Sequence, residues 1–131
     1  MRDRSYGDMR KKIVVADENR LIQNMLSRFL VKFGYDVICV DRGDEAYKII
    51  MSLIDAKMSP AAIICDLDMP DCNGLELVRS LIADCIDIPT VLMTDENHHE
   101  DIEELSRKIT LKRVQKPVEI SDIIDFIKEY D

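Results

Sequence analysis

The sequence predicts one doubly wound α/β domain, in which helices cover both faces of a parallel sheet. Short runs rich in β-branched residues alternate with amphipathic helical segments, five times over, from residue 12 to residue 130. The first, third and fourth runs are the most apolar, as expected for strands buried on both faces. Strands separated by helices pair in parallel through right-handed crossovers. The carboxyl ends of all five strands should therefore meet at one edge, where such domains bind ligands.

The first half of the chain supplies the first two strand–helix units. Residues 12–17 (KIVVAD) and 35–40 (YDVICV) have the composition of strands. Residues 21–33 and 44–56 have the period of helices, and Gly34 stands where a helix cap is expected. The first helix is predicted to bury one stripe: Leu21, Ile22, Met25, Leu26, Phe29, Leu30 and Phe33. The second is predicted to bury Ala46, Ile49, Ile50, Leu53 and Ile54.

The second half repeats the pattern three more times. Strands are predicted over residues 61–65, 88–94 and 111–116, and helices over residues 74–85, 98–109 and 119–130. The helix over 98–109 is acidic and poor in apolar residues, whereas the last helix places isoleucines 120, 123, 124 and 127 on one face.

Composition excludes several classes of function. The chain has 131 residues, enough for one domain, and its formal charge of −8 argues against a nucleic-acid surface. No apolar run is long enough to span a membrane, and the start lacks a signal peptide, so we expect a cytoplasmic protein. The four cysteines form no C-x-x-C pair and are expected to be free thiols. We expect residues 1–10 to be a flexible arm and residues 11–131 to form the domain.

Polar side chains stand where the predicted strands end. Asp17 and Glu18 follow the first strand, Asp66 the third, Thr94 the fourth and Lys116 the fifth. Because these ends share one edge of the sheet, three carboxylates, a hydroxyl and an ammonium should meet in one crevice.

Carboxylates gathered in this way repel one another unless a cation joins them. Oxygen ligands with room for water suit Mg²⁺ better than zinc. A metal ion, a lysine and a hydroxyl are also what a phosphoryl group needs during transfer. One of the carboxylates could then act as the nucleophile and form an acyl phosphate.

Four motifs in order make the sequence resemble the CheY-like receiver domain of two-component response regulators. They are Asp17-Glu18 after KIVVA, the run DLDMPDCNG over 66–74, Thr94 after IPTVLM, and QKP over 115–117. Any one of them alone has a plainer structural explanation, but all four in order on the right strand ends are specific. The resemblance covers about residues 11–130 and implies a flavodoxin-like sheet of order 2-1-3-4-5 with five helices.

The resemblance also implies the role of each residue at this edge. Asp66 would accept a phosphoryl group from a sensor histidine kinase or a phosphotransfer protein. Mg²⁺ would be held by Glu18, by Asp66, by Asp17 mainly through water, and by the backbone carbonyl of Asp68. A signalling role of this kind is not that of an enzyme that turns over a substrate.

Switching would involve the other two strand ends. Thr94 would bind a phosphoryl oxygen, Lys116 would pair with the phosphoryl group, and the Lys116–Pro117 bond would be cis. A downstream protein would bind the face formed by the fourth helix, the fifth strand and the last helix. Neither nucleic acid nor a membrane is expected as a partner.

Three residues depart from the family pattern. Glu18 stands where a second Asp is usual, and Asp95 stands where a small residue is usual. Arg113 replaces the aromatic residue whose rotamer reports phosphorylation in the family. We therefore expect Asp95 to repel the incoming group, and we name Arg113, with Thr94, as the switch residues.

Two other functions remain open on the sequence. The three departures allow a pseudo-receiver, a constitutive protein–protein interaction module. The DLD run at 66–68 also resembles the nucleophile motif of haloacid-dehalogenase-type phosphatases, although a whole strand–helix–strand–helix segment precedes it. Since no output domain follows residue 131, we expect either a single-domain regulator or the receiver part of a longer protein.

Overall fold

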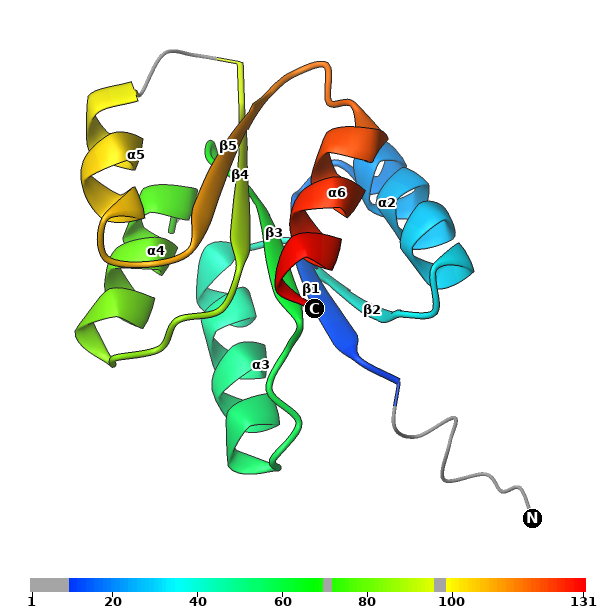
Figure 1. Ribbon diagram of the computed structural model, residues 1–131, viewed down its shortest axis with the longest axis horizontal. Coiled ribbons are helices and arrows are strands. Elements are labelled where there is room, and N and C mark those ends of the chain that lie inside the picture. The colour runs from blue at the N-terminus through cyan, green and yellow to red at the C-terminus, as the bar shows by residue number, and fades with distance from the viewer. Residues whose placement is uncertain (1–9, 70–71, 96–98) are drawn as a thin grey trace.

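The computed structural model describes residues 10–69, 72–95 and 99–131. Within these residues five strands alternate with five helices, as the sequence predicts (Figure 1). The elements are β1 (Lys12–Ala16), α2 (Arg20–Lys32), β2 (Asp36–Val40), α3 (Gly43–Asp55), β3 (Ala62–Asp66), α4 (Gly74–Ala83), β4 (Thr90–Thr94), α5 (His99–Ser106), β5 (Leu111–Gln115) and α6 (Ile120–Tyr130). Residues 1–9 of the predicted arm, and Pro70 and Asp71 of the third-strand motif, lie outside the described residues.

The strands form one parallel sheet in the order β2-β1-β3-β4-β5. This confirms the predicted doubly wound sheet. The order reverses direction at β1, whose neighbours are β2 on one side and β3 on the other. Ligands of doubly wound sheets bind at such a reversal, outside the carboxyl ends of the strands.

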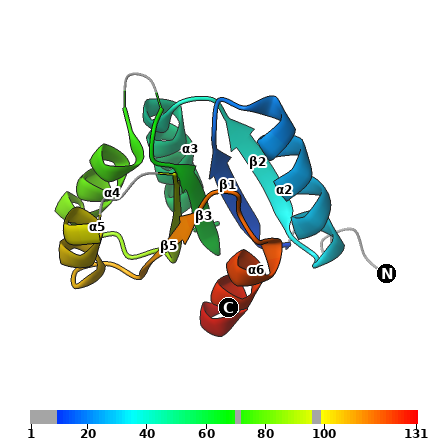
Figure 2. The ribbon, with the colours of Figure 1, turned by 90° about the horizontal axis from the view of Figure 1, so that it is seen from above.

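Helices cover both faces of the sheet, which lies between two hydrophobic layers (Figures 1 and 2). One layer joins alternate strand residues to α3, α4 and α5, with Ile50 and Leu81 at its centre. The other joins the remaining strand residues to α2 and α6, with Leu26 and Ile123. Every residue of β3 and of β4 is buried, whereas the edge strand β2 is only half-buried. This is the pattern that the apolar composition of the inner strands predicts.

The predicted stripe of α2 is confirmed in part: Ile22, Met25, Leu26 and Leu30 belong to the core or pack against it, but the other three residues do not. The helix buries Gln23, Leu26 and Leu30, while Leu21 is 78% exposed and Phe29 and Phe33 are both more than 40% exposed. An ammonium group lies over each of these two exposed rings, that of Lys32 at 5.7 Å from the Phe29 centroid and that of Lys128 at 4.4 Å from the Phe33 centroid. The helix packs on the sheet and also against α6. The side that these two neighbours bury lies to one side of the apolar stripe and not at its centre.

Local signals fix the ends of several helices. The Asn19 side chain accepts hydrogen bonds from the first turn of α2. Asn73 and Glu76 form a capping box at the start of α4. Gly34, just beyond α2, has φ +92°, which a residue with a side chain rarely adopts. The helices therefore start and stop within a few residues of the positions predicted from the sequence.

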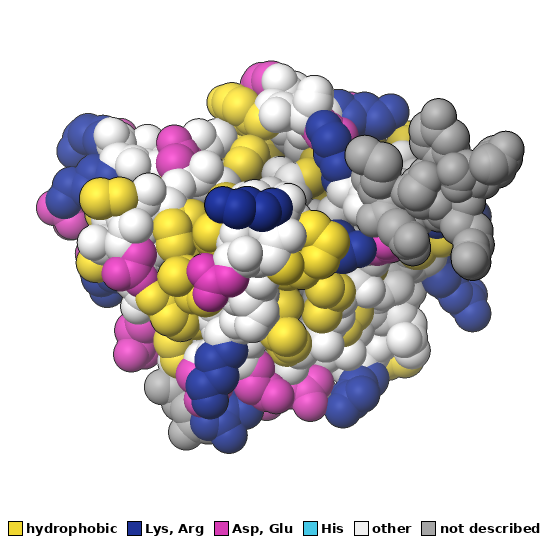
Figure 3. Space-filling model, turned by 90° about the horizontal axis from the view of Figure 1, so that it is seen from below, with side chains coloured by type: hydrophobic (Ala, Val, Ile, Leu, Met, Phe, Trp, Pro, Cys, Tyr) yellow, Lys and Arg dark blue, Asp and Glu magenta, His cyan; other side chains and the backbone are white. Residues whose placement is uncertain are grey.

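The two edges of the sheet differ in surface character. Figure 3 views the amino ends of the strands, where hydrophobic side chains gather near the centre of the face. The carboxyl edge instead carries the acidic residues that follow the strands. No helix among the described residues has the length and apolar character needed to cross a bilayer.

Candidate functional site: an acidic pocket at the carboxyl edge

A hollow of about 350 Å³ opens at the carboxyl edge beside the reversal in strand order. Its lining comes from the end of β3, the loops after β1, β3, β4 and β5, and the first turn of α2: Asp17, Glu18, Asn19, Ile22, Asp66, Asp68, Asp95 and Lys116. Of the residues that the structure describes, five carboxylates and a single lysine line it. The structure thus brings together the acids and the lysine that the sequence predicts would meet.

Asp66 and Lys116 form the central contact of this pocket. Lys116 Nζ lies 2.9 Å from Asp66 Oδ1, and the backbone N–H of Asp68 donates to the same oxygen at 3.2 Å. Asp66 is only 5% exposed. Desolvation would lower the pKa of Lys116, but the hydrogen bond and charge of Asp66, with Asp17 and Asp95, raise it overall. Lys116 is therefore held as a cation beside a nearly buried carboxylate.

Asp17 carries a polar atom that the described residues leave unsatisfied. Its Oδ1 accepts the backbone N–H of Asn19 at 2.8 Å, but its buried Oδ2 has no hydrogen-bond partner among the described residues. Burial raises the pKa of the Asp17 carboxyl, and the charge of nearby Asp66 raises it further. A carboxylate oxygen that faces other carboxylates without a donor is suited to a cation. The donor set, all oxygen, suits Mg²⁺.

The other predicted metal ligands lie at the mouth of the pocket. Glu18 and Asp68 both line it, yet both are exposed. As placed, no three of the described His, Cys, Asp and Glu residues form a group that could hold a metal ion by themselves. Any cation here would therefore need further oxygen ligands, which for Mg²⁺ are commonly water molecules.

The two predicted switch residues lie on the last two strands of the sheet. Thr94 ends β4 and is fully buried. Arg113 is half-buried on β5, where it pairs with Leu92 of β4. Two register positions thus separate Arg113 from Thr94, which pairs with Gln115. The Lys116–Pro117 bond is cis, as the resemblance implies.

Two glycines hold the loop after β3: Gly74, which ends the motif over 66–74, and Gly43, which the sequence analysis did not connect with the site. A Cβ on Gly74 would lie 3.2 Å from the carbonyl oxygen of Asp66, so α4 begins directly against that strand end. A Cβ on Gly43 would lie 2.3 Å from the carbonyl oxygen of Cys72, so any side chain there would force the loop to shift. The sequence offered one sign of these close contacts: a glycine stands at the start of a predicted helix, where a side chain is normally tolerated.

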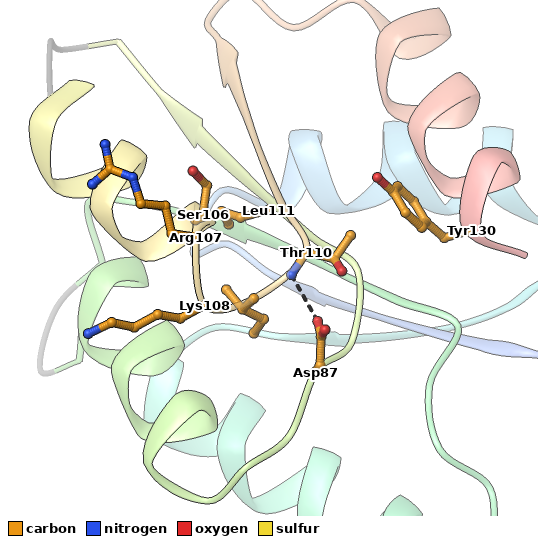
Figure 4. A pocket seen from close by; sticks show the side chains of 8 residues that line it. Asp87, Ser106, Arg107, Lys108, Thr110, Leu111 and Tyr130 are labelled. Carbon is orange, nitrogen blue, oxygen red and sulfur yellow. Dashed lines mark hydrogen bonds between the residues drawn. The ribbon is translucent and has the colours of Figure 1, made fainter.

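A second hollow, lined by Asp87, Lys108, Tyr130 and neighbouring residues, lies at the amino ends of the strands (Figure 4). Asp87 Oδ1 accepts the backbone N–H of Thr110 at 2.8 Å, which ties the start of β5 to the loop before β4. Arg107 and Lys108 point away from Tyr130 (Figure 4). Because its polar groups diverge, this hollow lacks the convergent chemistry of the acidic pocket.

Comparison with known families explains this arrangement. The model of the response regulator receiver domain matches residues 13–128. The chain belongs to the response regulator receiver family. Receiver domains are signalling modules of two-component systems, and the match gives no support to the phosphatase alternative.

Relatives of this receiver include short regulators of similar length. It is 25% identical over 122 residues to sporulation initiation phosphotransferase F of Bacillus subtilis strain 168, covering 93% of this chain and 94% of that one. It is 30% identical over 94 residues to the chemotaxis protein CheY1 of Helicobacter pylori strain J99, covering 70% and 73%.

Solved structures show the same fold. The receiver domain of a Francisella response regulator superposes with a TM-score of 0.77 at 22% identity, covering 92% of this chain and 95% of that one. The chemotaxis protein CheY4 of Vibrio cholerae gives a TM-score of 0.75 at 22% identity, covering 93% and 99%.

Proposed function

We propose that this receiver accepts a phosphoryl group on Asp66 and thereby changes its affinity for a partner protein. The observation that carries the proposal is the 2.9 Å contact between Lys116 Nζ and Asp66 Oδ1 in a pocket whose other charged lining residues are all carboxylates, among the described residues. A nearly buried carboxylate beside a fixed cation is an arrangement that can attack a phosphorus atom and stabilise the product. The proposed unit of function is residues 11–131, acting in the cytoplasm.

The proposed donor is a phosphohistidine of a sensor kinase or a phosphotransfer protein. One oxygen of the Asp66 carboxylate attacks phosphorus and forms a P–O bond, while the P–N bond to the donor imidazole breaks. The leaving nitrogen takes up a proton from solvent or from the donor protein. Lys116 then pairs with the transferred group instead of with the free carboxylate, and the Thr94 hydroxyl donates to one phosphoryl oxygen.

Mg²⁺ is the proposed cofactor. Asp17, Glu18, Asp66 and the backbone carbonyl of Asp68 are the residues that would hold it, and the unsatisfied Oδ2 of Asp17 supports this assignment. Bound there, Mg²⁺ supplies positive charge to the phosphoryl oxygens during transfer. The longer side chain of Glu18, which stands in the open mouth of the pocket, would reach into it from the loop after β1.

Arg113 is the proposed switch residue together with Thr94. It takes the β5 position of the family's aromatic residue and lies on the strand next to Thr94. The proposed output surface is the face of α5, β5 and α6, and it would bind a downstream protein. Arg113→Ala should abolish the change in amide NMR shifts on this face when BeF₃⁻ is added, with Lys112→Ala as the control on the same strand. Equal responses in wild type and Arg113→Ala would rule out this role.

Mass spectrometry tests the phosphoacceptor directly. Wild type treated with acetyl phosphate and Mg²⁺ should gain about 80 Da, the mass of one HPO₃ group. Asp66→Asn should gain nothing, and Asp68→Asn, which changes an exposed acid of the same loop, should gain the same mass as wild type. An adduct that persists in Asp66→Asn would refute the assignment.

Two observations favour a pseudo-receiver as the second candidate. No group of three described residues is arranged to hold a metal ion, and Asp95 adds a negative charge at the mouth of the pocket. In that case the chain would bind its partner constitutively. Absence of any adduct in wild type, with unchanged partner binding in Asp66→Asn, would establish this alternative.

A further inference from the structure

A glutamine occupies a core position in α2. Gln23 is 5% exposed and lies on the same buried side of the helix as Leu26 and Leu30. A buried side-chain amide is unfavourable unless its hydrogen-bonding groups are satisfied. An apolar residue would be the ordinary choice at this position, so the contacts of the amide identify what the residue does.

The Gln23 amide joins the ends of two strands. Its Nε2 donates to the backbone carbonyl of Asp17, to Asp41 Oδ1 at 2.9 Å, and more distantly to the carbonyl of Val40 at 3.3 Å. The same Val40 carbonyl also accepts the backbone N–H of Asp17 at 3.1 Å. One buried side chain therefore ties the end of β1 to the end of β2, on the β1 side of the acidic pocket.

Gln23 contacts the backbone of Asp17, the pocket residue whose carboxylate lacks a full set of hydrogen bonds. The Asp17 side chain has a single described hydrogen bond, to the backbone N–H of Asn19, and its Oδ2 has no partner among the described residues. The direction of this carboxylate is thus set chiefly by its backbone, which Gln23 holds at the carbonyl. Gln23 does not line the pocket itself.

The connection continues to the surface of the molecule. Asp41 Oδ2 accepts a hydrogen bond from the Arg20 guanidinium at 3.1 Å, and the Arg20 side chain is 75% exposed. A continuous chain of polar contacts therefore runs from the first turn of α2 through Asp41 and Gln23 to Asp17.

We infer that Gln23 is a positioning residue of the acidic pocket, which holds the Asp17 carboxylate in the direction needed to bind a divalent cation. The expected effect of Gln23 on phosphorylation rests on the proposed function, in which Asp66 accepts the phosphoryl group. Outer residues that orient metal ligands typically change metal affinity by about 10- to 100-fold when they are altered.

The test compares Gln23→Met with Leu30→Val. Methionine keeps the length and burial of glutamine but lacks the amide, whereas Leu30→Val loosens the same helix about two turns further on. The midpoints of urea unfolding establish that the two variants lose comparable stability. Mg²⁺ binding to each protein, without any phosphodonor, is then followed by amide NMR shifts, and phosphorylation of Asp66 is followed by mass spectrometry.

Gln23→Met should need about tenfold more Mg²⁺ for half-saturation, both in NMR binding and in the rate of phosphorylation. The maximal rate at saturating Mg²⁺ should stay near that of wild type, because the nucleophile is untouched. Leu30→Val should leave both half-saturation points unchanged. If Gln23→Met behaves as Leu30→Val does in Mg²⁺ binding, the inference is overturned.

A third measurement separates this inference from the proposed function. Hydrogen exchange of the Asp17 amide, which donates to Val40, should be faster by about tenfold in Gln23→Met and unchanged in Leu30→Val. Equal exchange in both variants would refute the positioning role. A wild type that is never phosphorylated, combined with the expected exchange and Mg²⁺ differences, would refute the phosphoacceptor function and leave the role of Gln23 intact.

Discussion

Lys116 Nζ lies 2.9 Å from Asp66 Oδ1 although fifty positions of sequence separate the two residues. The contact exists because parallel strands β3 and β5 deliver both side chains to the same edge of the sheet. Among the described residues that line the pocket, Lys116 faces five carboxylates as the only cation.

Replacing this lysine should slow phosphorylation and weaken the fold. Lys116→Met leaves Asp66 nearly buried without its cation, so we expect the rate with acetyl phosphate to fall by about 10- to 100-fold. Because the lysine side chain is 31% exposed, we expect the free energy of unfolding to fall by only about 1 kcal/mol. Rates by mass spectrometry and unfolding in urea measure both effects. Lys116→Arg, which keeps the charge, should retain the free energy of unfolding of wild type. If it loses as much stability as Lys116→Met, the positive charge is not what stabilises Asp66.

Removing the charge of Asp17 should stabilise the protein when no divalent cation is present. The pKa of Asp17 is raised by burial above its ordinary value of 3.8. A raised pKa means that the stability contributed by the protonated form is complete below about pH 3.8 and is lost as the pH rises through the folded-state pKa. Asp17→Asn should therefore be more stable than wild type at neutral pH in EDTA, by about 1 kcal/mol.

Urea unfolding between about pH 4 and 8 checks this expectation. The advantage of Asp17→Asn should shrink towards low pH and should disappear when Mg²⁺ is added to wild type. Asp68→Asn, at an exposed acid of the same pocket, is the control and should change stability less. If Asp17→Asn is less stable than wild type at neutral pH, the claim that the buried charge of Asp17 destabilises the protein is wrong.

A methyl group on Gly43 should disturb the loop that follows Asp66. The added Cβ would stand 2.3 Å from the carbonyl oxygen of Cys72, so this loop must shift. We expect Gly43→Ala to lower the free energy of unfolding by about 1 to 3 kcal/mol and to slow phosphorylation. Gly34→Ala provides a matched control, because it strains a φ of +92° but contacts nothing within 4 Å. It should lose about 1 kcal/mol and phosphorylate normally.

The far edge of the sheet contains a pH-sensitive cluster. The Tyr35 hydroxyl donates to Asp131 Oδ2 at 2.6 Å, and Lys11 pairs with the other oxygen of that carboxylate. Hydrogen bonds from Lys11 and Tyr35 lower the pKa of Asp131, so its contribution to stability is lost as the pH falls through the folded-state value. Burial and Asp131 raise the pKa of Tyr35 to about 12, so its contribution is complete below pH 10 and is lost as the pH rises through about 12.

Tyr35→Phe should lower the free energy of unfolding by about 1 kcal/mol at neutral pH. A double-mutant cycle with Asp131→Asn, measured by urea unfolding, should give a coupling of similar size. Additive single effects would show that the hydroxyl and the carboxylate do not interact. Phosphorylation of Asp66 should be unaffected, since this cluster lies at the opposite edge.

The sequence predicted the acidic pocket because its residues follow segments that could be identified as strands, and the helices between these strands imply that they run parallel. The runs KIVVA and AAIIC could hardly be other than buried strands, so the acids after them had to meet at one edge. The order of the strands was implied only by the resemblance to a family, since alternation alone does not say which strands are neighbours. Lys116 was found in the same way, after the last strand, whereas Thr94 lies buried at the end of β4 and its role at the pocket stays a prediction.

Other features depended on contacts between distant segments and could not be read from a local pattern. The apolar stripe of α2 suggested burial of Phe29 and Phe33, but the sheet and α6 together select a side of the helix that includes Gln23. The roles of Gly43 and Gly74 depend on which backbone atoms approach them. Periodicity reports which residues share a side of a helix and does not report which side another element will cover.

The glycine at the start of α4 has one mechanical consequence. Its Cα lies so close to the carbonyl of Asp66 and to the backbone of Leu67 that an added methyl would stand 3.2 and 3.1 Å from them. The end of β3 and the first turn of α4 therefore pack backbone against backbone, and the backbone N–H of Gly74 also donates to the carbonyl oxygen of Leu67 at 2.9 Å. We therefore expect a shift of the Asp66 main chain to displace the start of α4 and so to be carried along that helix.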